Sequence, residues 1–189
     1  MDGVNLLILT GPPGAGKSTV GKLVAANSPM SACINSDWFW TTIVNGQIPP
    51  WERAAKSQNE TMIRSAMAAG VRMANAGFAT VLDGIIGPWF FDTVREELAY
   101  CRVAVAYAVL RPDVDTCIAR AQGRALESEE HRESLTDEDP IRQMWNLFSD
   151  LGPMEPHVID TSDVDPEETA LLIQERITDG LLRFPTDAF

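Results

Sequence analysis

A glycine-rich segment near the N-terminus has the residue types and spacing that hold a chain of phosphates. It matches the pattern G-x-x-x-x-G-K-[ST]. Glycines at these positions let backbone N–H groups point inward around an anion, which a Cβ atom would obstruct. We therefore interpret the segment as a nucleotide-binding loop. Its residues are Gly11, Pro12, Pro13, Gly14, Ala15, Gly16, Lys17, Ser18 and Thr19.

Two side chains at the end of this loop can act on a bound triphosphate. Lys17 is expected to reach the β- and γ-phosphates, and the hydroxyl group of Ser18 is expected to ligate Mg²⁺. The loop leads into a predicted helix over residues 17–26. The unpaired N–H groups and partial positive charge at the start of a helix also favour an anion. ATP and Mg²⁺ are thus the expected ligands.

Two aspartates follow segments that are expected to be strands. Asp83 ends Val81-Leu82-Asp83, and Asp37 ends Asn35-Ser36-Asp37. Because ligands bind at the carboxyl ends of strands in open parallel sheets, both carboxylates should lie near the nucleotide-binding loop. We assign Asp83 to the Mg²⁺ side and Asp37 to a catalytic role at the acceptor hydroxyl. The two roles could be exchanged, and either aspartate could instead cap a helix.

Two arginines four residues apart would share one face of a later helix. Charge that develops on a transferred phosphoryl group calls for cations that arrive as water is excluded. A guanidinium group can also lie flat on an adenine ring. We interpret Arg124 as a catalytic lid arginine, Arg120 as an adenine contact, and residues 123–139 as the lid. The alternative is a surface helix with salt bridges to Glu127 or Asp113.

The rest of the chain alternates between strand and helix patterns. This alternation predicts one domain over residues 1–189, with a three-layer α/β/α fold, a five-stranded parallel sheet and right-handed crossovers. We expect strands over residues 4–10, 32–35, 79–82, 103–110 and 157–159. We expect helices over residues 17–26, 53–76, 89–99, 112–122, 140–151 and 166–182.

Half of the fourteen aromatic residues fall in two short regions that follow the two acidic strand ends. They could line an apolar acceptor pocket, because ligand sites are mostly hydrophobic with a few polar groups. They could equally pack helices onto the sheet, as aromatic residues do in most cores. The seven residues are Trp38, Phe39, Trp40, Trp51, Trp89, Phe90 and Phe91.

Composition narrows the classes of partner. The 189 residues are 45% apolar and 22% charged, which is typical of globular proteins. A net charge of −12 without a basic cluster argues against long nucleic acids, which bind basic faces. No apolar run is long enough to span a membrane. The N-terminus lacks a basic signal-like stretch, and three cysteines without a CxxC pair suggest reduced thiols. We expect a cytoplasmic protein, and its oligomeric state stays open.

The chain resembles the AAA-type P-loop kinases, a group that includes chloramphenicol phosphotransferase, gluconate kinase and polynucleotide kinase. The nucleotide-binding loop, Asp37, Asp83, the Arg120/Arg124 segment and residues 158–162 occur in the same order in that group. The resemblance implies a nucleoside-monophosphate-kinase-like sheet with strand order 2-3-1-4-5. It also implies an acceptor-side carboxylate at Asp37, a lid arginine at Arg124 and an adenine contact at Arg120, with the loop after Thr161 bordering the base.

These observations together predict a kinase that transfers the γ-phosphoryl group of Mg-ATP to a hydroxyl group of a small-molecule acceptor. One alternative is a nucleotide or polynucleotide 5′-kinase. Its contacts to an acceptor phosphate would have to come from Arg53, Arg64, Arg72 and Arg95. The other alternative is a nucleotide-gated regulatory NTPase that changes the conformation of a partner protein.

Overall fold

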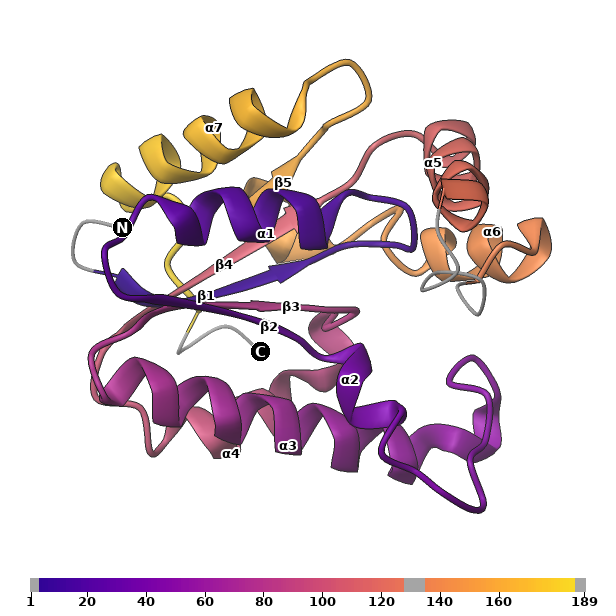
Figure 1. Cartoon of the computed structure of the whole chain (residues 1–189), viewed down its shortest axis with the longest axis horizontal. Helices are drawn as coiled ribbons and strands as arrows, with labels where there is room; N and C mark the ends of the chain where they lie inside the picture. The colour runs from indigo at the N-terminus through magenta and orange to yellow at the C-terminus, as the bar shows by residue number, and fades with distance from the viewer. Residues whose placement is uncertain (1–3, 128–134, 186–189) are drawn as a thin grey trace.

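The centre of the molecule is a five-stranded parallel sheet with the order β2-β3-β1-β4-β5. The computed structural model describes residues 4–127 and 135–185. The predicted fold class and strand order are confirmed (Figure 1). The strands are β1 (Val4–Thr10), β2 (Ser31–Asn35), β3 (Ala79–Asp83), β4 (Ala104–Leu110) and β5 (Val158–Ile159).

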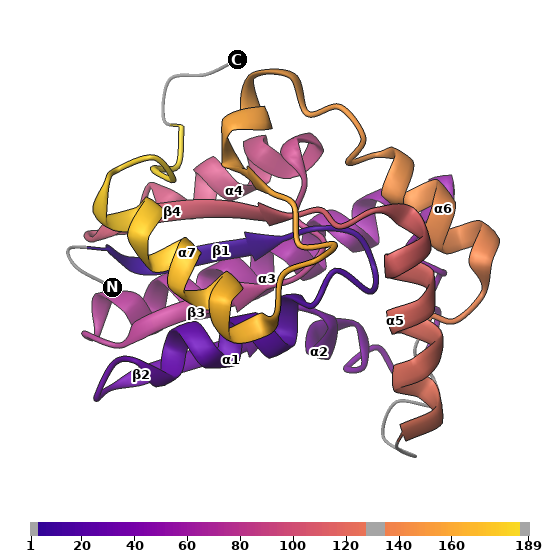
Figure 2. The same ribbon diagram turned by 90° about the horizontal axis from the view of Figure 1, so that it is seen from above.

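Helices cover both faces of the sheet. α1 and α7 lie on one face and α3 and α4 on the other, whereas α5 and α6 lie beyond the carboxyl ends of the strands (Figures 1 and 2). The helices are α1 (Lys17–Ala26), α2 (Asp37–Trp40), α3 (Lys56–Asn75), α4 (Phe91–Leu98), α5 (Val114–Glu127), α6 (Glu138–Asn146) and α7 (Pro166–Thr178). The 3₁₀ turns are η1 (Arg53–Ala55), η2 (Pro88–Phe90) and η4 (Gly152–His157).

The side chains of β1 show why the sequence selects this three-layer arrangement. Successive side chains of a strand point to opposite faces. Leu6 and Ile8 join the core beneath α3 and α4, and Leu7 and Leu9 join the core beneath α1 and α7. All four are fully buried. The continuous apolar run of β1 is therefore the signature of a strand that is covered on both faces.

The C-terminal segment completes one edge of the sheet. β5 pairs only with Val109 and Leu110 of β4. Nearer the start of β4, the Tyr107 N–H donates to the Leu182 oxygen at 2.8 Å, and the Phe184 N–H donates to the Val105 oxygen at 2.9 Å. These backbone bonds cover the part of β4 that β5 is too short to reach, which limits the exposed sheet edge.

Several element boundaries differ from the sequence-based expectation. α5 continues through Gly123 to Glu127, so the expected start of the lid is helical. A single glycine costs a helix only about 1 kcal/mol relative to alanine, which good helix formers on both sides tolerate. β5 omits His157, which ends a 3₁₀ turn, and α7 stops at Thr178 instead of residue 182. The part of the expected lid over residues 128–134 lies outside the described residues.

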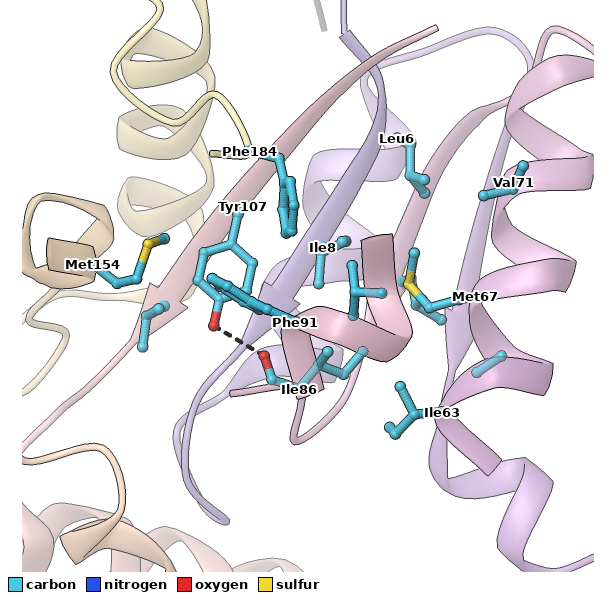
Figure 3. Packing of buried hydrophobic residues seen from close by; sticks show 14 of the residues in the cluster. Leu6, Ile8, Ile63, Met67, Val71, Ile86, Phe91, Tyr107, Met154 and Phe184 are labelled. Carbon is cyan, nitrogen blue, oxygen red and sulfur yellow. Dashed lines mark hydrogen bonds between the residues drawn. The ribbon is translucent and has the colours of Figure 1, made fainter. Parts of the chain in front are cut away.

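A buried tyrosine connects the core to the loop after β3. The hydroxyl group of Tyr107 donates to the Ile86 oxygen at 2.9 Å, and its ring lies edge-on to Phe91 with centroids 5.2 Å apart (Figure 3). Burial raises the pKa of this phenol above its ordinary value. The loop that follows Asp83 is thus held by a hydrogen bond inside the apolar core.

We predict that Tyr107→Phe lowers the free energy of unfolding by about 1–3 kcal/mol, because it leaves the buried Ile86 carbonyl without this donor. Urea denaturation measures the change. The matched control is Tyr100→Phe, since Tyr100 is 73% exposed. Equal stabilities for the two variants would contradict a structural role for the Tyr107 hydroxyl group.

Candidate active site

The nucleotide-binding loop lies between β1 and α1, and two of its glycines are required for different reasons. Gly14 has φ +79°, and a Cβ there would lie 2.0 Å from the Cys117 oxygen, because the loop packs directly on α5. Gly16 has φ +89°, but a Cβ there would have no neighbour within 4 Å. Its glycine is required by the left-handed backbone alone, next to space that is open for a ligand.

Lys17 lies across the loop that precedes it. Its Nζ atom donates to the Pro12 oxygen at 2.9 Å. The Ala15 N–H also points to this oxygen, at 3.2 Å, and the Val20 N–H donates to the Gly16 oxygen as α1 begins. An ammonium group and a helix N-terminus are thus combined at one loop, which is an arrangement that favours an anion.

Asp83 meets this loop because of strand register. It pairs with Leu9 of β1, so β3 ends where the loop begins. The Ser18 hydroxyl group donates to Asp83 Oδ1 at 3.2 Å. Asp83 is only 2% exposed, and the thiol of Cys33 lies 3.9 Å from its Oδ2 atom. The two predicted metal-binding residues are therefore in direct contact.

Burial dominates the electrostatics of Asp83. Desolvation raises its pKa to about 6, and the negative charge of Asp37 adds to the increase. The positive charges of Lys17 and Lys22 and the hydrogen bond from Ser18 act in the opposite direction but do not offset the burial. A buried carboxylate that lacks sufficient positive charge nearby is a candidate for cation binding.

The donor set fits Mg²⁺. A hydroxyl and a carboxylate are hard oxygen ligands, and Mg²⁺ is commonly held by one or two protein oxygens together with water and substrate phosphates. Among residues 4–127 and 135–185, no group of three or more His, Cys, Asp or Glu side chains is placed to hold a metal by itself. Ser18 and Asp83 would thus hold a metal that is shared with a phosphate chain.

Asp37 is the exposed first residue of α2. Its negative charge contributes to the raised pKa of Asp83, so the two strand-end carboxylates lie near each other, as expected. The Asp37 N–H donates to Asn35 Oδ1 at 2.7 Å. Asp83 is thus buried beside the loop and Asp37 faces solvent, and the roles assigned to them stay predictions.

Arg120 lies against the loop that the resemblance placed at the adenine. Its NH2 group donates to the Thr161 oxygen at 3.0 Å, and the Ser162 oxygen lies 3.4 Å away. Of the salt bridges in the alternative interpretation, none is found between Arg120 and Asp113 in the described part of the chain, and the Asp113 carboxylate accepts from the N–H and hydroxyl groups of Thr116. The side chain of Arg124 lies outside the described residues, so its role as a lid arginine stays a prediction.

The aromatic residues divide between the two interpretations. Phe91 is a core residue with 2% exposure, whereas Trp38, Trp51 and Trp89 are 59%, 48% and 44% exposed. The others, Phe39, Trp40 and Phe90, pack partly against the core. The exposed tryptophans are therefore the members of this set that remain available for an acceptor.

Sequence reasoning missed two groups that shape the site. Asn35 contacts both Ser18 and Asp37, and only its place two residues before Asp37 could have indicated a turn. Arg111 forms two bonds with Glu155, at 2.7 and 2.9 Å, and also donates to the Phe148 oxygen. These bonds join the end of β4 to the chain after α6, and no local pattern links residues so far apart.

Comparisons with known proteins show the family and the fold of this chain. A family model described as an AAA domain matches residues 6–151. A comparison of the sequence with curated proteins gives no significant match. Many solved structures share the fold, and three of them are given below. Their sequence identities of 14–21% show similarity of fold alone.

Shikimate kinase from Acinetobacter baumannii, solved with shikimate, is 21% identical with a TM-score of 0.59, and 94% of each chain is covered. The APS kinase of Mycobacterium tuberculosis, solved with AMPPNP and APS, is 14% identical with a TM-score of 0.64, covering 93% of this chain and 98% of that one. The tunicamycin resistance protein of Deinococcus radiodurans is 14% identical with a TM-score of 0.62, covering 96% and 99%.

We predict that Asp83→Asn stabilises the ligand-free protein at neutral pH. The pKa of Asp83 is raised in the folded state, from about 3.8 to about 6, so the folded state binds this proton more tightly than the unfolded state does. The stability that the bound proton provides is lost as pH rises through this window, and the ionised carboxylate then destabilises the fold. Asparagine removes that penalty while its side-chain oxygen still accepts from Ser18. The gain should be on the order of 2 kcal/mol above pH 7 and should vanish near pH 4.

Thermal unfolding of both proteins between pH 4 and pH 8 measures this difference. Calorimetry with AMP-PNP should show in parallel that the variant needs roughly 10–100-fold more Mg²⁺ for the same binding. For the wild type, protons should compete with Mg²⁺ below about pH 6, where Asp83 becomes protonated. A variant that is less stable than wild type at pH 7 would contradict the electrostatic analysis.

Proposed function

Because the chain belongs to the AAA domain family, we propose that it is an ATP-dependent phosphotransferase acting on the hydroxyl group of a small molecule. One observation carries the proposal. Three different segments bring an ammonium group, a hydroxyl group and two carboxylates to the carboxyl edge of the sheet. The residues are Lys17, Ser18, Asp83 and Asp37. A nucleotide-binding loop alone serves many NTPases. A second, exposed carboxylate beside it is what a kinase requires for its acceptor.

The residues divide the work of phosphoryl transfer. The backbone of residues 11–18 would surround the phosphates of ATP, and Lys17 would leave the Pro12 oxygen to contact the β- and γ-phosphates. Arg120 would contact the adenine beside Thr161. When bound between Ser18 and Asp83, Mg²⁺ supplies positive charge to the phosphate oxygens. Arg124 would add a further positive charge when the lid segment covers the donor.

Asp37 would act on the acceptor. Its exposed carboxylate would orient the hydroxyl group and accept its proton as the oxygen attacks the γ-phosphorus. Asp37 is exposed at the N-terminus of α2, whereas Asp83 is 2% exposed. The difference in burial is the reason to place the base at Asp37 and the metal at Asp83.

Two of the four arginines considered as contacts for an acceptor phosphate are engaged in ion pairs. Arg64 pairs with Glu96 and Glu97, and Arg95 pairs with Asp92 and stacks over the Phe91 ring. Both were candidate contacts of a 5′-kinase. Three exposed tryptophans suit a ring or an apolar surface of a neutral molecule instead. The proposal also includes the absence of long nucleic acids as partners, given the net charge of −12.

Two of the solved structures support a small acceptor, since they are kinases bound to shikimate and to APS.

We keep a cytoplasmic location as part of the proposal, consistent with three free cysteines. No helix within the described parts of the chain has the length and apolar character that crossing a membrane needs.

A transfer assay tests the proposal. Radiolabelled ATP and Mg²⁺ are offered with a panel of alcohols, sugars, hydroxylated antibiotics and an oligonucleotide with a 5′-hydroxyl group. We expect labelled product from a small hydroxylated compound. Protein that binds Mg-ATP but labels none of a broad panel would count against the proposal, and labelling of the oligonucleotide alone would favour the 5′-kinase.

With an acceptor in hand, we predict that Asp37→Asn lowers kcat by roughly 10²–10⁴-fold, because it removes the proton acceptor, while the affinity for Mg-ATP stays within a few-fold. Lys17→Ala should instead reduce both kcat and ATP binding, since the ammonium group contacts the donor. Steady-state kinetics and calorimetry separate the two effects. The control is Asp92→Asn on α4, whose carboxylate is fully exposed. A minor effect at Asp37 would move the catalytic role to another residue.

A further inference from the structure

Asn35 stands between the donor side and the acceptor side of the site. It is the last residue of β2, and its register partner in β3 is Asp83. Its Oδ1 atom accepts from the Asp37 N–H at 2.7 Å, and its Nδ2 atom donates to the Ser18 Oγ atom at 3.3 Å. One amide group therefore contacts both the proposed metal ligand and the start of the helix that carries the proposed base.

The directions of these hydrogen bonds are fixed by chemistry. The backbone N–H of Asp37 can only donate, so the oxygen of the Asn35 amide must face it and the NH₂ group must face Ser18. Ser18 then uses its single proton for Asp83 Oδ1, 3.2 Å away. A hydroxyl oxygen has two lone pairs. One accepts from Asn35 and the other is left for a cation.

The connection to α2 is short and constrained. The N–H group of Ser36, between the two residues, donates to the Asp83 oxygen at 2.8 Å. Ser36 is fully buried, and a Cβ on Gly84 would lie 1.9 Å from its Oγ atom. The backbone between Asn35 and Asp37 therefore has little room to adjust independently of β3.

A helix cap alone does not explain the residue type. An Asp, Ser or Thr at position 35 could accept from the Asp37 N–H as well as Asn does. A hydroxyl group can also accept and donate, but only from one oxygen atom, whereas the amide has its acceptor and its donor on two separate atoms that can face two partners. The second half of the amide is what points to a role beyond the local turn.

We propose that Asn35 is a positioning residue that couples the metal side of the site to the acceptor side. Its amide orients the Ser18 hydroxyl group so that a lone pair faces the cation, and it holds the first turn of α2 so that Asp37 follows any movement of Ser18. The inference rests on the proposed function, because it assumes that Ser18 ligates Mg²⁺ and that Asp37 serves the acceptor.

Two variants of Asn35 separate the two halves of the amide. Asn35→Ala removes both bonds. Asn35→Thr keeps an uncharged acceptor for the Asp37 N–H but has no second polar atom in the place of Nδ2. The matched control is Ser31→Ala, at the opposite end of the same strand. Calorimetry measures AMP-PNP binding with and without Mg²⁺, and NMR measures hydrogen exchange of the Asp37 N–H group.

We expect the gain in AMP-PNP affinity that Mg²⁺ provides to fall about tenfold in both Asn35 variants, with metal-free binding unchanged within about twofold. Exchange of the Asp37 N–H should be fast in Asn35→Ala and slow in Asn35→Thr. Addition of Mg²⁺ and AMP-PNP should slow this exchange further in the wild type and in Ser31→Ala, but not in Asn35→Thr.

Two results would overturn the coupling role. In the first, Asn35→Ala matches Ser31→Ala in both measurements. In the second, Asn35→Thr matches the wild type in its response to Mg²⁺, and Asn35 then only holds the Asp37 N–H at the start of α2. Because Asn35→Thr keeps the cap, it tests the role even where Asn35→Ala unfolds. If the wild type and Ser31→Ala themselves bind no nucleotide, the proposed function fails and the inference fails with it.

Discussion

The register of three adjacent strands is the constraint on which the site depends. Asp83 of β3 pairs with Leu9 of β1 on one side and with Asn35 of β2 on the other. Since paired residues in a parallel sheet project to the same face, Asp83 and Asn35 both lie on the side of α1. Backbone bonds extend the pairing beyond the strands, as the Gly84 N–H donates to the Leu9 oxygen at 3.1 Å. A shift of one residue would turn both polar groups away from the loop.

This register has an electrostatic consequence. It takes a carboxylate out of water in order to place it at the nucleotide-binding loop, and the pKa of Asp83 rises accordingly. The desolvated charge lowers the stability of the ligand-free fold at neutral pH, and a bound cation would restore that stability. Under the proposed function, metal binding and stability would be linked at one residue, and desolvated ionisable groups of this kind are concentrated in active sites.

The parts that the sequence predicted correctly are those with local signals. Glycine spacing indicated the loop between Thr10 and Lys17, and apolar runs bounded by Asp37 and Asp83 indicated two of the strands. The resemblance supplied the strand order, which periodicity does not contain. The signal at Gly123 was misread as the end of a helix, because propensity is a weak guide where the flanking residues favour helix.

Contacts between distant segments had no such signal. The Asn35 to Ser18 bond depends on strand order and register together, and the pairing of Arg111 with Glu155 depends on how the chain returns after α6. Of the aromatic residues, sequence alone could not separate Phe91 in the core from Trp38 at the surface, because both follow a strand end.

The proposed donor and acceptor sides of the site are built in different ways, and this explains why one is easier to predict from sequence than the other. The donor side uses backbone amides, whose geometry requires glycine and lysine at fixed spacing, and the strand-end Asp83. The proposed acceptor side includes the segment between α2 and α3. Side-chain amide groups at the start of α3 hold this segment against the helix. Gln58 bonds to both the N–H and the oxygen of Ile48, and Asn59 donates to the Pro50 oxygen.

These bonds to the backbone fix where the segment lies, but they do not determine which side chains it exposes to solvent. Trp51 follows the clamped residues directly and is half exposed, and Trp38 lies on α2 at the other end of the same segment. The scaffold could keep its bonds from Gln58 and Asn59 while these exposed positions change. Under the proposed function, the identity of the acceptor would be set by surface residues that the fold does not constrain, and the use of a nucleotide by residues that it does.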